Sequence, residues 1–160
     1  METVDILGRK WQINCMGCSI ANGEMEVPGG IIYETENFIV HQDPNNPIPG
    51  FMIIGPKRHI KNISQFTQDE MNEFSQILYK TRYALSSFED IDYCTLIQEE
   101  HSPHFHLWLL PKYNWMENVC IDGLNSVIPM LKYSKENWKT EKMITKILET
   151  ARAIKELLGK

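Results

Sequence analysis

The sequence predicts an α+β domain whose strands form a mainly antiparallel sheet with one long helix, followed by a helical extension. Three observations predict this class. Strand-like runs occur in the order three strands, one helix and two strands. The first two runs are joined by a short polar link that is typical of a hairpin. The helix between the third and fourth runs carries its own capping signal.

The beginning of the chain predicts little regular structure. Residues 1–12 show no strong pattern, so we expect a leader without strands or helices. Residues 15–23 predict a short helix that ends at Asn22-Gly23, because glycine readily takes the left-handed conformation of a helix C-cap. The first pair of strands is then predicted at residues 31–34 and 38–41.

A loop rich in proline and asparagine follows at residues 43–50. Its prolines exclude it from a strand ladder, and loops of this kind often carry ligand contacts. Residues 51–54 form the third strand, and because this run is fully apolar we expect it near the centre of the sheet.

The long helix is predicted to begin at Thr67, because Thr67 and Glu70 have the spacing of a capping box. The residues behind the cap that share one helical face are Met71, Phe74, Leu78, Thr81 and Leu85. Residues 92–98 predict the fourth strand and residues 104–111 the fifth, with a short acidic turn between them.

The C-terminal part of the chain predicts helices only. Residues 118–131 predict a short helix that Pro129 stops or kinks, and residues 134–158 predict a longer amphipathic helix. We therefore divide the chain into a domain at 1–113 and a helical extension at 114–160, packed either on the domain or at a dimer interface.

Composition and charge exclude several classes of partner. The chain of 160 residues fits one domain, and its 42% hydrophobic and 23% charged residues are ordinary for a globular protein. A net charge of −5 provides no broad basic surface, so we expect neither a nucleic-acid polymer nor a membrane as partner. No apolar run approaches the ~18 residues that a membrane span needs, and we expect a cytoplasmic protein.

The residues most typical of chemistry are three histidines, His101, His104 and His106, in the stretch 99–111. In a strand, His104 and His106 would share one face at roughly 6.6 Å along the backbone, given a rise of about 3.3 Å per residue. Buried imidazoles must satisfy both ring nitrogens or shift their pKa, and two neighbours repel if either becomes charged. A chemical role is therefore a simpler explanation than core packing.

Cys15 and Cys18 have the C-x2-C spacing of a metal half-site or a redox pair. In a reducing compartment either of these is favoured over a structural disulfide. Imidazoles can complete a tetrahedral zinc site around two thiolates. Sequence spacing does not choose among the candidate partners, which are His41, His59, His101 and His104.

With these residues in view, the chain resembles the histidine triad (HIT) superfamily of nucleotide hydrolases and transferases over about residues 13–113. Four motifs in order carry the resemblance: Cys15-x2-Cys18 followed by Asn22-Gly23-Glu24, the run 38–43 before the proline-rich loop, Pro56-Lys-Arg-His59-Ile60, and His104-Phe-His106-Leu-Trp108-Leu-Leu-Pro111.

The resemblance implies a structural zinc ion, whose ligands at the matching positions are Cys15, Cys18, His59 and His104. It also implies that His106 is the nucleophile that attacks the α-phosphorus of a nucleotide, and that Asp43 holds the ribose hydroxyls. The chemistry of the residues agrees, because a neutral imidazole with an unperturbed pKa near 6.5 keeps a free lone pair at pH 7. Zinc on His104 would anchor the strand that presents His106.

The chain departs from the family pattern at the third triad position, where Trp108 replaces histidine. An indole can donate a hydrogen bond but cannot relay a proton. His101 is the nearest substitute for protonating the leaving group. Ser102 and the backbone amides of the turn at 99–103 are the nearest donors for the phosphate oxygens.

Two further residues are assigned to nucleotide binding together with Asp43 and Trp108. Gln98 stands where a phosphate-contacting asparagine is common in the family, and His41, at a strand end, is expected to line the pocket.

These features predict a nucleotide hydrolase or nucleotidyltransferase that acts on a nucleoside monophosphate linked to a phosphate or amine leaving group, through a nucleotidyl-histidine on His106. One alternative is a nucleotide-binding module with little or no catalysis. Another is a catalytic metal site made by His101, His104 and His106 themselves. A homodimer is plausible, because HIT-like proteins often pair.

Overall fold

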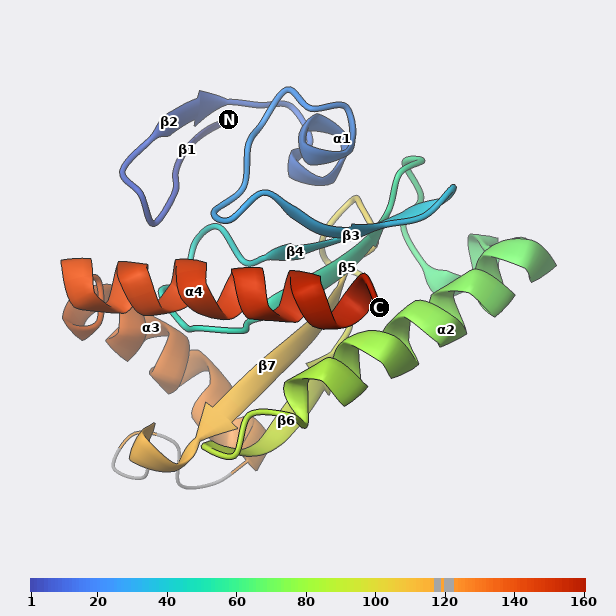
Figure 1. Cartoon of the computed structure of the whole chain (residues 1–160). Coiled ribbons are helices and arrows are strands. Elements are labelled where there is room, and N and C mark those ends of the chain that lie inside the picture. Colours follow the sequence, from blue (N-terminus) through green and yellow to red (C-terminus); the bar gives the residue numbers. More distant parts are fainter. Residues whose placement is uncertain (117–118, 120–122) are drawn as a thin grey trace.

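A five-stranded sheet runs through the protein, and this computed structural model describes residues 1–116, 119 and 123–160 (Figure 1). The strands, in order across the sheet, are β3 (Ile31–Glu34), β4 (Phe38–Gln42), β5 (Met52–Pro56), β7 (Leu107–Tyr113) and β6 (Ile91–Ile97). Every neighbouring pair is antiparallel, and the apolar strand β5 lies in the middle. The predicted α+β class is confirmed.

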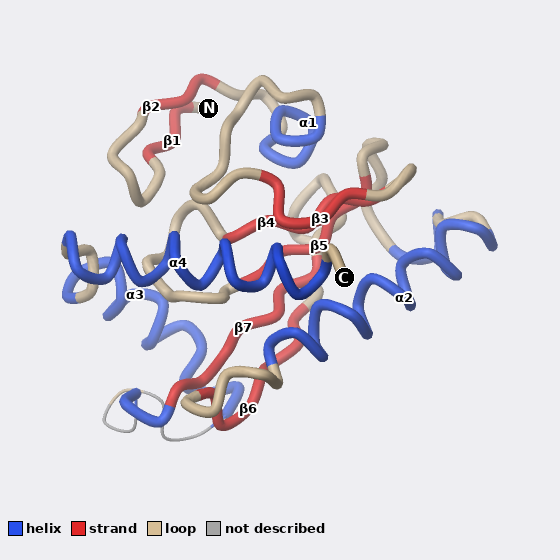
Figure 2. Tube along the Cα trace, viewed as in Figure 1, coloured by secondary structure: helices blue, strands red, loops and turns tan. Residues whose placement is uncertain are grey.

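Two long helices, α2 (Gln68–Leu85) and α4 (Glu141–Leu158), cover one face of the sheet, as can be followed in Figure 2. Both share one buried apolar cluster with the strands, to which the helices contribute Phe74, Ile77, Leu85, Ala151 and Ile154. Burying one large apolar side chain stabilises a fold by roughly 1.5–3 kcal/mol, so α4 is a substantial part of this core. The division of the chain at residues 113 and 114 stays a prediction.

The opposite face of the sheet is covered by α1 (Met16–Ala21) and α3 (Val127–Asn137). Successive side chains of a strand point to opposite faces. Val40 of β4 therefore packs in the α2 and α4 cluster, whereas Ile39 packs towards α1. The candidate site lies on this second face.

The expectation of an irregular leader at residues 1–12 is wrong. β1 (Glu2–Val4) and β2 (Lys10–Gln12) form an antiparallel hairpin. Its turn is organised by the buried Asp5, whose Oδ1 accepts hydrogen bonds from the backbone N–H groups of Leu7 and Arg9, both at 2.9 Å. An aspartate that satisfies the backbone two and four residues ahead is a turn signal that hydrophobic periodicity does not contain.

The predicted C-terminal helices have the wrong boundaries. The residues from Ser134 to Asn137 belong to α3, and α4 begins only after Thr140, whose Oγ1 accepts from the Met143 N–H at 3.2 Å. Pro129 neither stops nor kinks α3, because it is in the first turn, where backbone amides have no helical acceptor. The part of the predicted 118–131 helix at 118 and 120–122 lies outside the described residues.

The remaining elements in the described part of the chain are short 3-10 helices: η1 (Ile63–Gln65), η2 (Asn114–Met116) and η3 (Gly123–Ser126). Among the described residues, no helix combines the length and the apolar character needed to cross a bilayer.

Candidate functional site

Four side chains from three separate segments meet beside α1. Cys15 is the N-cap of α1 and Cys18 lies in its first turn, while His59 follows β5 and His104 precedes β7. One ligand atom from each of the four lies within 4.8 Å of the others. The fold therefore chooses among the histidine partners that the sequence left open: His59 and His104 join the two thiols.

The distances within this cluster fit zinc. His59 Nδ1 lies 3.2 Å from Cys18 Sγ and 3.4 Å from Cys15 Sγ, and His104 Nδ1 lies 3.5 and 3.4 Å from the same atoms. A tetrahedral zinc ion with Zn–S bonds of about 2.3 Å and Zn–N bonds of about 2.0–2.1 Å separates sulfur from nitrogen by roughly 3.5 Å. The four residues thus form a possible zinc site.

Without a bound cation, the Cys18 thiol is protonated and the His104 imidazole is neutral. Burial and the neighbouring Cys15 raise the pKa of the Cys18 thiol to about 11 when no cation is near. Burial lowers the pKa of His104, which keeps its imidazole neutral. Because a metal needs thiolate and neutral imidazole ligands, binding of the ion would release protons from the thiols.

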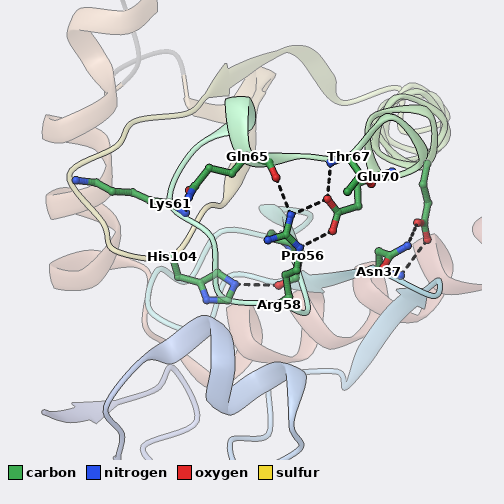
Figure 3. Close-up of polar contacts among 9 residues, drawn as sticks. Asn37, Pro56, Arg58, Lys61, Gln65, Thr67, Glu70 and His104 are labelled. Carbon is green, nitrogen blue, oxygen red and sulfur yellow. Dashed lines mark hydrogen bonds and ion pairs between the residues drawn. The ribbon is translucent and has the colours of Figure 1, made fainter.

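The ring of His104 is held in one orientation by β5. His104 Nε2 lies 2.9 Å from the backbone oxygen of Pro56, so Nε2 carries the hydrogen and donates it, as Figure 3 shows. The lone pair of Nδ1 then points at the thiols. With both ring nitrogens engaged in this way, the structure favours the four-ligand site over the alternative site of His101, His104 and His106.

Gly17 lets α1 approach His104. A Cβ atom placed on Gly17 would lie 2.5 Å from the Cδ2 of the His104 ring, which is closer than real contacts allow. The glycine within Cys-Met-Gly-Cys therefore gives the His104 ring its space beside α1. Sequence analysis did not assign it, because the contact exists only once residues 17 and 104 have been brought together.

The loop that presents His59 is tied to the start of α2. Arg58 Nε and Nη2 donate to the carboxylate of Glu70 at 2.8 and 2.9 Å, and Nη2 also donates to the Gln65 backbone oxygen (Figure 3). The hydrogen bonds from Arg58 lower the pKa of Glu70 to about 2. Glu70 also accepts from the Thr67 N–H at 2.7 Å, so the predicted capping box is confirmed. The carboxylate that caps α2 is thus the same one that holds Arg58.

A cavity of about 320 Å³ lies next to the metal cluster, on the face of the sheet that α1 covers. Its floor comes from alternate residues of three strands, and α1 and the segment before β7 form its walls. The lining side chains from the sheet, the loop after β4 and the segment before β7 include Ile39, His41, Asp43, Ile53, Ser102, His106 and Trp108. Those from α1 are Met16 and Ile20.

His106 lines this cavity with one ring nitrogen fixed. Its Nδ1 lies 3.0 Å from the backbone oxygen of His104, so Nδ1 carries the hydrogen. Its Nε2, which makes no hydrogen bond within the described residues, holds a lone pair. Ser102 Oγ donates to the same His104 oxygen at 3.2 Å. The segment that binds the metal through a side chain thus orients His106 through its backbone.

Asp43 is the buried carboxylate of the cavity. Its Oδ1 accepts from the Asn45 N–H at 2.9 Å, from the Asn46 N–H at 2.6 Å and from Asn46 Nδ2 at 2.9 Å. Burial raises the pKa of Asp43, and the hydrogen bonds from Asn46 and Asn45 oppose that rise. Its second oxygen has no hydrogen-bond partner among the described residues and is therefore available to a donor on a ligand.

The remaining predicted site residues divide into two groups. Trp108 lines the cavity 5.9 Å from the His106 ring and packs edge-on against Phe51 at 5.4 Å. His101 is exposed and Gln98 is half-buried, and neither lines the cavity; the Nε2 of Gln98 is buried without a partner in the described part of the chain. The roles assigned to His101 and Gln98 stay predictions.

The backbone explains where the histidine segment lies. The predicted strand at 104–111 is wrong at its start, since β7 begins at Leu107. The Phe105 N–H donates to the Ile60 backbone oxygen at 2.6 Å, so this segment bonds to the loop after β5 instead of continuing the sheet. This bond brings His104 beside His59.

Comparisons with known proteins agree with this arrangement. The family model described as HIT domain matches residues 24–115, which is more than half of the chain. That range contains His59, His104 and His106 and begins after the two cysteines. Protein hit from Bacillus subtilis is 27% identical over 106 residues, covering 62% of this chain and 72% of that protein.

Solved structures with the same fold extend over nearly the whole chain. A Zn-bound histidine triad family protein from Mycobacterium smegmatis has a TM-score of 0.64 at 17% identity, covering 91% of this chain and 94% of that chain. A hypothetical histidine triad nucleotide-binding protein from Sulfolobus tokodaii has a TM-score of 0.60 at 17% identity, covering 91% and 92%. The family match, the shared fold and the cysteine–histidine cluster lead to one conclusion: this chain belongs to the HIT family, with the ligand set of its zinc-containing branch.

Proposed function

We propose that this protein is a nucleotide hydrolase or nucleotidyltransferase that forms a nucleotidyl-histidine intermediate on His106. The observation that carries the proposal is the orientation of His106: Nδ1 is bound to the His104 oxygen at 3.0 Å, and the lone pair of Nε2 is left for an electrophile. The substrates that fit are nucleoside monophosphates linked to a phosphate or amine leaving group, such as dinucleoside polyphosphates or nucleoside phosphoramidates.

The layout of the cavity supports a bound nucleotide. His106 lies at one side, and the unpaired oxygen of Asp43 is available for a ribose hydroxyl. The apolar side chains of Met16, Ile20 and Ile53 offer a surface for a base. The Sulfolobus tokodaii relative, whose name describes it as nucleotide-binding, has the same fold, which agrees with this use of the cavity.

The reaction proceeds in two displacements. His106 Nε2 attacks the α-phosphorus, the bond from phosphorus to the leaving oxygen or nitrogen breaks, and the leaving group takes a proton. Water, or a second phosphate, then attacks the same phosphorus and releases the nucleotide and the imidazole. The His104 backbone oxygen, which accepts the hydrogen of Nδ1, stabilises the positive charge that the ring acquires.

The proton for the leaving group must come from a group other than Trp108, because an indole N–H does not titrate. Ser102 lines the cavity and is the nearest hydroxyl of the segment, and His101 lies on the exposed turn before it. We assign phosphate contacts to Ser102, whose hydroxyl would turn from the His104 oxygen to a phosphate oxygen, and proton donation to His101 or to water. Gln98 remains a candidate hydrogen-bond donor to the phosphate.

The metal has a structural role in this proposal. Four protein ligands close a tetrahedral site and leave no open position, so a bound zinc ion would hold α1, the His59 loop and the His104 segment together. Cysteines that serve as ligands must stay reduced, which supports a cytoplasmic location.

The test is intact-mass spectrometry after mixing with adenosine 5′-phosphoramidate. We expect the parent protein to turn over the substrate and a trapped sample to carry one nucleotide. His106→Asn should lose at least 10³-fold in kcat/KM, because nucleophilic catalysis is removed, while keeping its zinc content and its affinity for the product nucleotide. Unchanged turnover by His106→Asn would eliminate the mechanism.

A nucleotide-binding module without catalysis is the second candidate, and Trp108 is the observation that favours it. The indole packs against Phe51 and replaces the third histidine of the triad with a group that cannot donate a titratable proton. Nucleotide binding by the parent protein with neither adduct nor product would select this candidate.

A further inference from the structure

One ring nitrogen of a buried histidine in the apolar part of the cavity has no assigned partner. His41 lies on β4 between Ile39 and Asp43, all three line the cavity, and His41 is only 5% exposed. Its neighbour across the sheet is Ile53 of β5, and α1 presents Met16 from the opposite wall. An imidazole among these apolar side chains is unfavourable unless its ring nitrogens have hydrogen-bond partners.

The hydrogen bonding of His41 fixes what its free nitrogen can do. Nδ1 lies 2.9 Å from the Gln42 backbone oxygen, and because a carbonyl can only accept, Nδ1 carries the hydrogen. Nε2 is then an acceptor, and it makes no hydrogen bond within the described residues. Burial lowers the pKa of His41 to about 4, with a smaller lowering by His106, so the ring stays neutral at pH 7.

The position and the chemistry of His41 favour the nucleoside over the phosphate as its partner. His41 pairs with Ile53, and Ile53 pairs with Trp108 of β7, so two strand spacings, roughly 10 Å, separate β4 from β7. His106 lies on the β7 side. A neutral acceptor would also repel phosphate oxygens, which are acceptors themselves. The partner of His41 is therefore a donor on the nucleoside.

Within the nucleoside, the base supplies the more suitable donor. The unpaired oxygen of Asp43 already provides an acceptor for the ribose hydroxyls, whereas the apolar side chains around His41 suit a planar ring. We infer that His41 Nε2 accepts a hydrogen bond from the exocyclic amine of the bound base, which makes His41 a specificity-determining residue. This inference rests on the proposed nucleotide function and adds to it a class of substrate, the nucleotides of amino-bearing bases such as adenine.

The test compares two ligands that differ only in the amine. Isothermal titration calorimetry would measure AMP and purine riboside 5′-monophosphate against the zinc-loaded parent protein, His41→Phe and His41→Gln. A buried acceptor left without a donor weakens binding, so we expect the parent protein to prefer AMP by about tenfold or more. His41→Phe keeps an aromatic ring without an acceptor and should reduce that preference to about twofold or less, whereas the amide oxygen of His41→Gln should restore part of it.

Zinc content serves as the folding control, because His41 is not one of the four metal ligands. A variant with full zinc and an unchanged circular dichroism spectrum is folded, so its ligand preference can be compared with that of the parent protein. 2′-Deoxy-AMP provides a further arm: if the loss of affinity in His41→Phe disappears with this ligand, His41 binds the ribose, and the assignment to the base is overturned.

The remaining outcomes distinguish a failure of this inference from a failure of the proposed nucleotide function. Equal binding of both ligands by the parent protein, or a preference for AMP that survives in His41→Phe, overturns the inference and leaves the nucleotide function intact. Amine-dependent binding with full turnover by His106→Asn supports the role of His41 and eliminates the proposed mechanism. No binding of any nucleotide overturns both.

Discussion

Gly17 leaves the metal ligand His104 the space that any other side chain would occupy. Because its Cβ would lie 2.5 Å from the His104 ring, any larger residue must displace either α1 or the imidazole. We predict that Gly17→Ala lowers zinc affinity about 10–100-fold, the range seen when the surroundings of metal ligands are disturbed. Competition with a chromogenic chelator measures it.

Gly159→Ala is the matched control for Gly17. Gly159 has a φ of −79°, and a Cβ there would meet its nearest atom, the Lys155 backbone oxygen, at an ordinary 3.4 Å, with no metal ligand among its neighbours. Zinc affinity should be unchanged in this variant. Parent-like affinity in Gly17→Ala would show that the helix can move away at little cost.

The cysteines give a second prediction at the same scale. Cys15→Ser removes one of four ligands and should leave less than half of the bound zinc after dialysis, with a melting temperature lowered by roughly 5–15 °C for a loss of about 2–4 kcal/mol. Metal analysis and calorimetry measure the two effects. Cys94→Ser is the control, since Cys94 is a free thiol outside the cluster, and full zinc in Cys15→Ser would contradict the four-ligand site.

At the scale of elements, the start of α2 is coupled to the loop that carries His59. Arg58 binds the Glu70 carboxylate, which also caps the helix at Thr67, and the pKa of Glu70 falls from its usual value near 4.5 to about 2. A carboxyl with a depressed folded-state pKa stabilises the fold above pH 4.5. That contribution is lost as the pH falls towards 2.

We therefore predict that the free energy of unfolding falls between about pH 5 and pH 2 and that Glu70→Gln removes part of this dependence. The expected contribution is about 1–2 kcal/mol, below the full linkage value because Arg58 is half exposed. Urea denaturation at several pH values measures it. Glu73→Gln, one turn away on α2, is a useful comparison, because the Glu73 carboxylate accepts from Asn37 and not from Arg58. Parallel pH curves for the parent protein and Glu70→Gln would show that this ion pair does not contribute to the pH dependence of the free energy of unfolding.

Much of the element-level structure could be predicted from the sequence. Short apolar runs bounded by turn residues placed the strands of the sheet, and Thr67 with Glu70 placed the start of α2. The hairpin of residues 1–12 was missed because its turn depends on Asp5, and the helix boundary at Thr140 was missed because its signal is one capping side chain and not an apolar pattern. Local patterns predict where regular structure occurs better than where it stops.

The site was predictable to the extent that it follows motifs. The resemblance supplied the four metal ligands, and the structure brings them together. The clearance at Gly17, the anchoring of Arg58 and the acceptor state of His41 depend on contacts between residues far apart in the chain. No local pattern contains those contacts.

At the scale of the whole molecule, β6 is an edge strand whose outer side has no partner strand in the described part of the chain. Leu96 on this strand is 47% exposed. A long edge strand with exposed apolar side chains is suited to pairing with another copy. We predict a homodimer in which two β6 strands meet and extend the sheet, and sedimentation velocity measures its stoichiometry.

Leu96→Lys tests where the two copies meet. A lysine on the edge strand should shift the protein to monomer by placing charge in the contact. Leu157→Lys on α4, at an exposed apolar position away from the edge, should not. A monomeric parent protein, or dissociation by Leu157→Lys alone, would refute this arrangement.

His104 serves two neighbours at once, with its ring towards the sulfur atoms and its carbonyl towards the imidazole of His106. A change that frees the His104 ring from the metal cluster therefore also loosens the hydrogen bond that orients His106. Under the proposed function, catalysis would then follow the cellular supply of zinc, although the ion itself never meets the substrate.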